Sequence, residues 1–268
     1  MQTVDEVLRQ IAEALWQDRY DDALALGRNA VRRFPQDPEV RAAHGDALWC
    51  TDELEAACRA YSEAARLAPA RALLWANVAR CRFALADFVA AREAAQRAQA
   101  VEETPETMEI LCRLAERESD LEAADRWGRR AHALDPEEFP LPHRVDEKDF
   151  RRLVTEAVNE IPESFQNALA KDVAILVEPV PEKDLIHAEK PPLDPGLLGL
   201  YVGVPLPERE EIMGGRALPD RIYLFQRNLE HEATSRDELV KQIRITLFHE
   251  VGHYFGFSDE DLEERDFG

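Results

Sequence analysis

A segment of 16 residues recurs four times in the first half of the chain, and this repetition restricts the possible folds more than any other feature. The copies begin at Tyr20, Leu54, Phe88 and Leu121, so their spacing is 34, 34 and 33 residues. Two places in every copy hold alanine: Ala23, Ala57, Ala91 and Ala124, then Ala30, Ala64, Ala98 and Ala131. Helices approach each other closely only where side chains are short. The repeat therefore predicts stacked helical pairs, because a single pair of this length cannot bury its own apolar face.

The four segments resemble the second helix of the tetratricopeptide repeat, with its two small residues and its closing proline. Pro35, Pro69 and Pro136 close three of the copies, and Glu103 stands at this place in the other. The resemblance implies about four helical pairs over residues 1–137. It also implies a concave groove that is lined by the first helices and binds a protein or peptide.

Side chains of the first helices are candidates for this partner groove. The helical register assigns five residues to it: Trp16, Trp49, Asn77, Arg80 and Phe83. Such side chains can hold an extended peptide or a partner helix. The alternative is that the aromatic residues are packing residues, because large aromatic side chains are usually buried for much of their surface. The sequence leaves the identity of the partner open.

Composition changes near residue 138. Residues 1–137 hold 31 alanines, three glycines and five prolines, whereas residues 138–268 hold seven alanines, eight glycines and eleven prolines. Because glycine and proline interrupt regular structure, the second part is expected to mix helices, strands and turns. Two prolines close together mark residues 138–147 as a linker. We therefore expect two domains, residues 1–137 and residues 148–268.

Charge and cysteine usage exclude several classes of protein. The chain carries 54 acidic against 33 basic side chains, a net charge of −21, which argues against nucleic-acid binding because that function needs a basic surface. No apolar run approaches the roughly 18 residues that a membrane helix needs, and the first residues lack the basic and apolar pattern of a signal peptide. The four cysteines form no CxxC pair and are expected to be buried packing residues. These features predict a cytoplasmic protein without a membrane segment.

The second part carries recognisable helix and strand patterns. Helices are predicted over 148–160 and 235–256, with a short turn of helix after Pro162, and strands over 172–180, 197–205 and 221–226. The third strand follows a predicted turn at residues 217–220. Ser235 and Glu238 are expected to form a capping box at the start of the long helix, and Gly256 is expected to end it.

The motif His249-Glu250-Val251-Gly252-His253 lies near the end of this long helix. Spacing of four residues puts both imidazoles on one helix face, where a single ion can bind them. Glu250 follows the first histidine and can accept a proton from a water molecule at the ion. A chain reversal at Gly256 would bring Asp259 to the same ion as a third ligand.

The ligand set leaves two questions open. Asp261 is the alternative to Asp259 as third ligand, and Asp261 or Glu263 could instead orient an imidazole. Two histidines and one carboxylate suit one Zn²⁺ per chain, although other divalent ions also accept such a set.

The second part of the chain resembles the minimal-zincin family of zinc metallopeptidases. Three segments are similar to successive signatures of that family, in the same order: LLGLYVGVPLPER (197–209), LPDRIYLFQ (218–226) and HEVGHYFGFSDEDL (249–262). The resemblance implies an α+β zincin-like domain with a small mixed sheet and an active-site helix that carries HExxH. It further implies a set of site residues, namely the zinc ligands His249, His253 and Asp259 and the general base Glu250.

The sequence thus predicts an all-α helical-repeat array followed by a zincin-like domain. The function that we expect is that of a zinc-dependent metallopeptidase whose repeats recruit a protein partner or substrate. Glu250 favours catalysis, because a structural metal site needs no base. Two alternatives stay open: a non-catalytic interaction scaffold with a structural metal site, and an amide hydrolase that acts on something other than protein.

Overall fold

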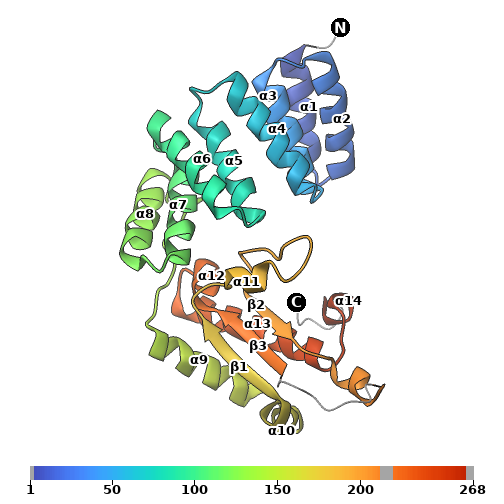
Figure 1. Cartoon of the computed structure of the whole chain (residues 1–268), viewed down its shortest axis with the longest axis vertical. Helices are drawn as coiled ribbons and strands as arrows, with labels where there is room; N and C mark the ends of the chain where they lie inside the picture. The colour runs from blue at the N-terminus through green and yellow to red at the C-terminus, as the bar shows by residue number, and fades with distance from the viewer. Residues whose placement is uncertain (1–2, 212–219, 264–268) are drawn as a thin grey trace. The chain divides into compact units, whose positions relative to one another are not determined.

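The computed structural model describes residues 3–211 and 220–263 of the chain. Contacts between Cα atoms divide the chain into two compact units, Met1–Phe139 with Ile186–Pro195 and Pro140–Leu185 with Gly196–Gly268. The chain is mostly helical and has a small mixed sheet in its second part (Figure 1), which confirms the predicted fold class. Within the described ranges, no helix is both long enough and apolar enough to cross a membrane.

The first unit contains a regular succession of antiparallel helices whose lengths alternate between 13 and 14 residues. They are α1 (Val4–Trp16), α2 (Tyr20–Arg33), α3 (Pro38–Cys50), α4 (Leu54–Leu67), α5 (Ala72–Ala84), α6 (Phe88–Val101), α7 (Pro105–Arg117) and α8 (Leu121–Leu134). The first helix of each pair (α1, α3, α5 and α7) is followed by one residue with positive φ: Asp18, Asp52, Ala86 and Ser119. These residues are 34, 34 and 33 positions apart, so the backbone repeats with the period that the sequence shows.

Side-chain packing explains why alanine recurs in the repeats. All eight recurring alanines are at most 2% exposed, and all but Ala98 belong to continuous apolar clusters. Short side chains at these places let consecutive helices pack closely. Cys58, Cys81 and Cys112 are buried as predicted, whereas the prediction is wrong for Cys50, which is exposed. Cys50 is the last residue of α3, where the chain turns toward α4, and the helix pair does not cover it.

The second unit combines a small sheet with helices of very different lengths. Its elements begin with α9 (Glu147–Glu160), α10 (Glu163–Asp172), β1 (Val173–Glu178), α11 (Lys183–Ile186), whose last residue is counted with the first unit, β2 (Gly199–Val202) and the 3₁₀ helix η1 (Leu206–Glu211). They continue with β3 (Asp220–Phe225), α12 (Gln226–His231), α13 (Arg236–Tyr254) and α14 (Asp259–Glu263). β2 is shorter than predicted, because the chain leaves the strand after Val202 and enters η1 at Leu206. The predicted turn before β3 lies outside the described residues, except for Asp220.

The sheet has the order β1-β3-β2. β1 runs parallel to β3 with Ile175 opposite Ile222, and β2 runs antiparallel to β3 with Tyr201 opposite Ile222. The long helix α13 packs against β2, β3 and α9. Ile222 and Leu224 of β3 are fully buried in the same apolar cluster as Ile243 of α13. The sheet therefore supports α13 along the side that faces the core.

Candidate metal centre

Helix α13 carries the HExxH motif and has defined ends. At its start the Ser235 hydroxyl accepts a hydrogen bond from the backbone N–H of Glu238 at 3.3 Å. The Glu238 carboxylate accepts hydrogen bonds from the N–H and the hydroxyl of Thr234, both at 2.7 Å. The predicted capping box paired this carboxylate with Ser235, so its short hydrogen bonds lie one residue earlier in the chain than predicted. At the other end Gly256 has φ +89°, a backbone conformation that residues other than glycine rarely adopt.

Three side chains bring their ligand atoms together at the end of α13. The Nε2 atoms of His249 and His253 are 3.0 Å apart. Asp259 Oδ1 lies 3.1 Å from the first of these nitrogens and 3.3 Å from the second. Ligand atoms around a tetrahedral Zn²⁺ with bonds of about 2.0–2.1 Å are separated by about 3.4 Å. The three donor atoms thus lie slightly closer together than around such an ion, and the donor types suit zinc.

A backbone contact orients one of the two imidazoles. His253 Nδ1 lies 3.0 Å from the carbonyl oxygen of Phe257. Because a carbonyl only accepts hydrogen bonds, the proton belongs on Nδ1, and the lone pair of Nε2 points toward His249 and Asp259. This is the orientation in which a histidine binds a metal while its other nitrogen is held by the protein.

The two candidate aspartates have different partners. The Asp259 side chain is 76% exposed, and its recorded contacts are with the two imidazoles. Asp261 accepts hydrogen bonds from the N–H and the hydroxyl of Ser258 at 2.9 and 2.7 Å, while the Ser258 hydroxyl accepts one from Asp261 N–H at 3.2 Å. Asp261 therefore takes part in capping α14, and Asp259 joins the cluster of ligand atoms. The side chain of Glu263 lies outside the described residues.

Glu250 lies beside this cluster, on a different face of α13. Its side chain is buried, and its Oε2 accepts a hydrogen bond from the backbone N–H of Tyr201 in β2 at 2.7 Å. Burial raises the pKa of Glu250 to about 7, although the neighbouring His253 and the Tyr201 amide both act to lower it. A carboxyl with such a pKa can accept and release protons near neutral pH.

The supporting residues in β2 were not predicted from the sequence. A Cβ atom at Gly199 would lie 2.6 Å from Thr246 Cγ2 and 3.0 Å from Glu250 Cγ. Only glycine therefore lets β2 come close enough for the Tyr201 amide to reach Glu250. Glycine inside a strand pattern is the signal that could have indicated this close approach.

The predicted groove residues of the first unit have different surroundings. Trp16 is 88% exposed, whereas Trp49 and Asn77 are partly buried and the Arg80 guanidinium lies 4.5 Å above the Trp49 ring. Phe83 is buried, because its ring packs edge to face against Phe88 with centroids 5.4 Å apart. Its assignment to an open groove is therefore corrected to a packing role, which was the alternative for the aromatic residues.

Comparisons with known proteins relate the second part of the chain to a peptidase family. Residues 170–268 match the family model of zincin-like metallopeptidases, so the match includes β1 to β3 and all the residues of the candidate centre. None of the curated proteins compared with the chain matches it.

Among the solved structures that are similar to the chain are the following two. A thermophilic tetratricopeptide-repeat protein of Thermus thermophilus is 21% identical, with coverage of 50% of this chain and 75% of that one and a TM-score of 0.46. The APC/C hetero-tetramer Cut9–Hcn1 is 19% identical, with coverage of 63% and 32% and a TM-score of 0.43. From its own sequence period, backbone period and family match, the chain combines tetratricopeptide-like repeats with a zincin-like region.

Proposed function

We propose that the second unit is a zinc-dependent peptidase and that the first unit holds a protein partner or substrate for it. The observation that carries this proposal is the triangle of donor atoms from His249, His253 and Asp259, with separations of 3.0–3.3 Å, beside the buried carboxylate of Glu250. A structural metal site needs four protein ligands and no base. Here three ligands and an adjacent base favour a site that leaves one position for water or substrate.

Each site residue has a defined task in amide hydrolysis. His249, His253 and Asp259 would hold the zinc ion, and the Phe257 carbonyl keeps His253 in the tautomer that can bind it. When bound, zinc would supply a Lewis acid that polarises the amide carbonyl and makes a water molecule more acidic. Glu250 takes a proton from the attacking water and delivers it to the leaving amine. The Tyr201 amide holds the Glu250 carboxylate in place for both transfers.

The helical repeats supply the recruiting surface in this proposal. Trp16 is almost fully exposed, and the exposed Arg80 lies over the partly buried Trp49. Exposed aromatic and arginine side chains are enriched where proteins bind partners. We propose a protein or peptide as the partner.

Replacement of Glu250 by glutamine tests the catalytic proposal. Glu250→Gln retains the shape of the side chain but cannot accept the proton, so we expect zinc content and folding to stay unchanged while hydrolysis falls by about 10²–10⁴-fold. A soluble cell extract incubated with the purified protein provides the substrates, and mass spectrometry of new peptide ends reports cleavage. Glu260→Gln is the matched control, because Glu260 is exposed on α14 and should leave cleavage as it is.

Two results would count against the peptidase. Equal cleavage by the parent protein and Glu250→Gln would contradict the role of Glu250. A zinc ion with four protein ligands, together with no cleaved protein in the extract, would favour the interaction scaffold with a structural metal site.

A further inference from the structure

The short helix α14 carries Asp259, and one of its side chains, Leu262, packs into the interior of the second unit. Asp259, Glu260 and Asp261 are exposed, whereas Leu262 is only 2% exposed. Among the side chains of α14 that the structure describes, Leu262 is therefore the one that packs against the protein interior. The contact between Ser258 and Asp261 caps the helix.

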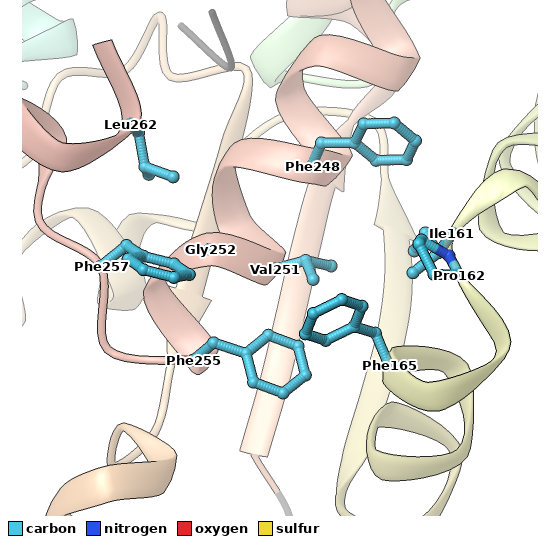
Figure 2. Close-up of a pocket in the computed structure, with 9 residues that line it drawn as sticks. All are labelled: Ile161, Pro162, Phe165, Phe248, Val251, Gly252, Phe255, Phe257 and Leu262. Carbon is cyan, nitrogen blue, oxygen red and sulfur yellow. The ribbon is translucent and has the colours of Figure 1, made fainter. Parts of the chain in front are cut away.

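Leu262 packs directly on the backbone of α13. A Cβ atom at position 252 would lie 2.4 Å from Leu262 Cδ2, so the absence of a side chain at Gly252 creates the place that Leu262 occupies. Figure 2 shows Leu262 extending toward α13 at Gly252. Gly252 immediately precedes the ligand His253, and this contact links α14 to the segment that carries both histidines.

The space around Leu262 is apolar and is not filled. Leu262 and Gly252 line a cavity of about 230 Å³, together with Phe257, with Ile161 and Pro162 between α9 and α10, and with side chains from α10 and α13 (Figure 2). Leucine therefore forms one wall of this cavity and is not enclosed on all sides. A longer flexible side chain such as methionine can be accommodated at the same position.

The spacing of Leu262 and Asp259 connects this contact to the metal centre. Residues three apart on a helix lie on the same face, so a buried Leu262 turns Asp259 toward α13. The Asp259 side chain is itself 76% exposed, and the contacts recorded for it are those with His249 and His253. The position of the Asp259 carboxylate consequently depends on how α14 packs against α13.

We propose that Leu262, seated on Gly252, is the positioning residue that brings the Asp259 carboxylate to the two histidines. The proposal rests on the proposed function, because it takes Asp259 as the third zinc ligand. The contact between Leu262 and Gly252 would thus affect metal affinity, although Leu262 is not a metal ligand and is not part of the HExxH motif.

Metal affinity measured in single and double variants tests this proposal. Co²⁺ binding is followed through its visible absorption, and Zn²⁺ affinity is measured by competition with a chromophoric chelator. We expect Leu262→Ala to weaken Zn²⁺ binding by about 10–100-fold, as loss of a residue that orients a ligand does. Leu262→Met should retain most of the affinity, and Gly252→Ala should weaken it by displacing Leu262.

A matched control separates positioning from general stability. Leu153→Ala removes a buried leucine of α9 in the same unit, so we expect it to lower the melting temperature while metal affinity and the Co²⁺ spectrum stay unchanged. If Leu262→Ala does not fold, Leu262→Val provides a smaller truncation for the same measurements.

The double variant Asp259→Ala/Leu262→Ala decides the mechanism. If Leu262 acts through Asp259, its replacement should cause no further loss of affinity once Asp259 is absent. Independent, additive losses would overturn the proposal, and so would full affinity in Leu262→Ala. If Asp259→Ala itself leaves metal affinity unchanged while Asp261→Ala weakens it, the ligand assignment in the proposed function fails instead.

Discussion

Glu250 and Asp259 are carboxylates of the same segment, and their surroundings give them different chemical properties. Glu250 is 7% exposed, and this burial raises its pKa to about 7, although the backbone amide that donates a hydrogen bond to it acts to lower the pKa. Asp259 is exposed, and its carboxylate faces two imidazoles. A neutral pKa suits a general base, and an exposed carboxylate suits a metal ligand. The two proposed roles thus follow from local environment at the scale of single residues.

His44 provides a prediction at this scale that concerns stability. Burial of the imidazole lowers the pKa of His44, and the positive charge of Arg28 acts in the same direction. As the pH falls, the unfolded chain therefore binds this proton before the folded chain does, and folding stability should decrease below about pH 6.5. We expect the stability contributed by the neutral imidazole to be fully present above that pH.

Replacement of His44 tests this pH dependence. In His44→Gln the free energy of unfolding should depend less on pH between about 5 and 6.5, and the slope should differ from that of the parent by no more than about 1.4 kcal/mol per pH unit. Denaturant unfolding followed by the helical circular dichroism signal gives the slopes. Parallel curves for the parent and His44→Gln would show that His44 is not the source.

At the scale of elements, α13 is approached closely from two sides, and a glycine permits each approach. Gly199 lets β2 contact Thr246 and Glu250, and Gly252 lets Leu262 of α14 contact the helix backbone. The first contact holds Glu250, the proposed general base, and the second is proposed to hold Asp259, the proposed third ligand. A glycine on one of the two elements at each contact therefore lets α13 organise both parts of the proposed site.

Gly199→Ala should disturb the first of these contacts. The added methyl group meets Thr246 Cγ2 at 2.6 Å, so we expect a loss of stability of about 1–3 kcal/mol, as for other overpacked positions. Hydrolysis should fall because Glu250 shifts, while zinc content should stay near that of the parent. Thermal unfolding and metal analysis of the purified variant provide the measurements.

A compensating replacement makes this test specific. Thr246→Ser removes Cγ2 and retains the hydroxyl, so Gly199→Ala/Thr246→Ser should be more stable than Gly199→Ala alone. Thr246→Ser by itself serves as the control. If Gly199→Ala is as stable as the parent protein, the close contact between position 199 and Thr246 does not limit stability.

At the scale of the whole molecule, the two units are stabilised in different ways. The array in Met1–Phe139 depends on contacts between successive helices, each of which packs against its neighbours. The second unit carries the candidate metal centre on α13 and α14. Metal binding should therefore affect the stability of the second unit far more than that of the first.

Removal of metal checks this difference. Treatment of the zinc-loaded protein with a chelator should leave most of the helical circular dichroism signal, while the melting transition of the second unit should move to lower temperature. In Asp259→Ala, which is expected to bind zinc weakly, the chelator should have little effect. Loss of the whole helical signal on chelation would contradict separate stabilisation of the array.

Local features of this protein could be predicted from its sequence. The helical pairs follow from alanines that recur every 33–34 residues, and the adjacent imidazoles follow from spacing of four residues on one helix. The ends of α13 follow from Ser235 and Gly256. Each of these predictions depends on residues close together in the chain or on a regular period, and both are visible in the sequence.

Only the tertiary structure decided the contacts between distant residues. The Tyr201 amide reaches Glu250 across 49 positions of sequence, and neither residue type indicates the other. The burial of Phe83 likewise depends on how α6 packs against α5, and the different contacts of Asp259 and Asp261 depend on how α14 packs against α13. The sequence determined which helices form and which chemical groups they carry, because those properties are set locally. Packing determined which of these groups meet, because close approach between elements depends on the shape of every side chain between them.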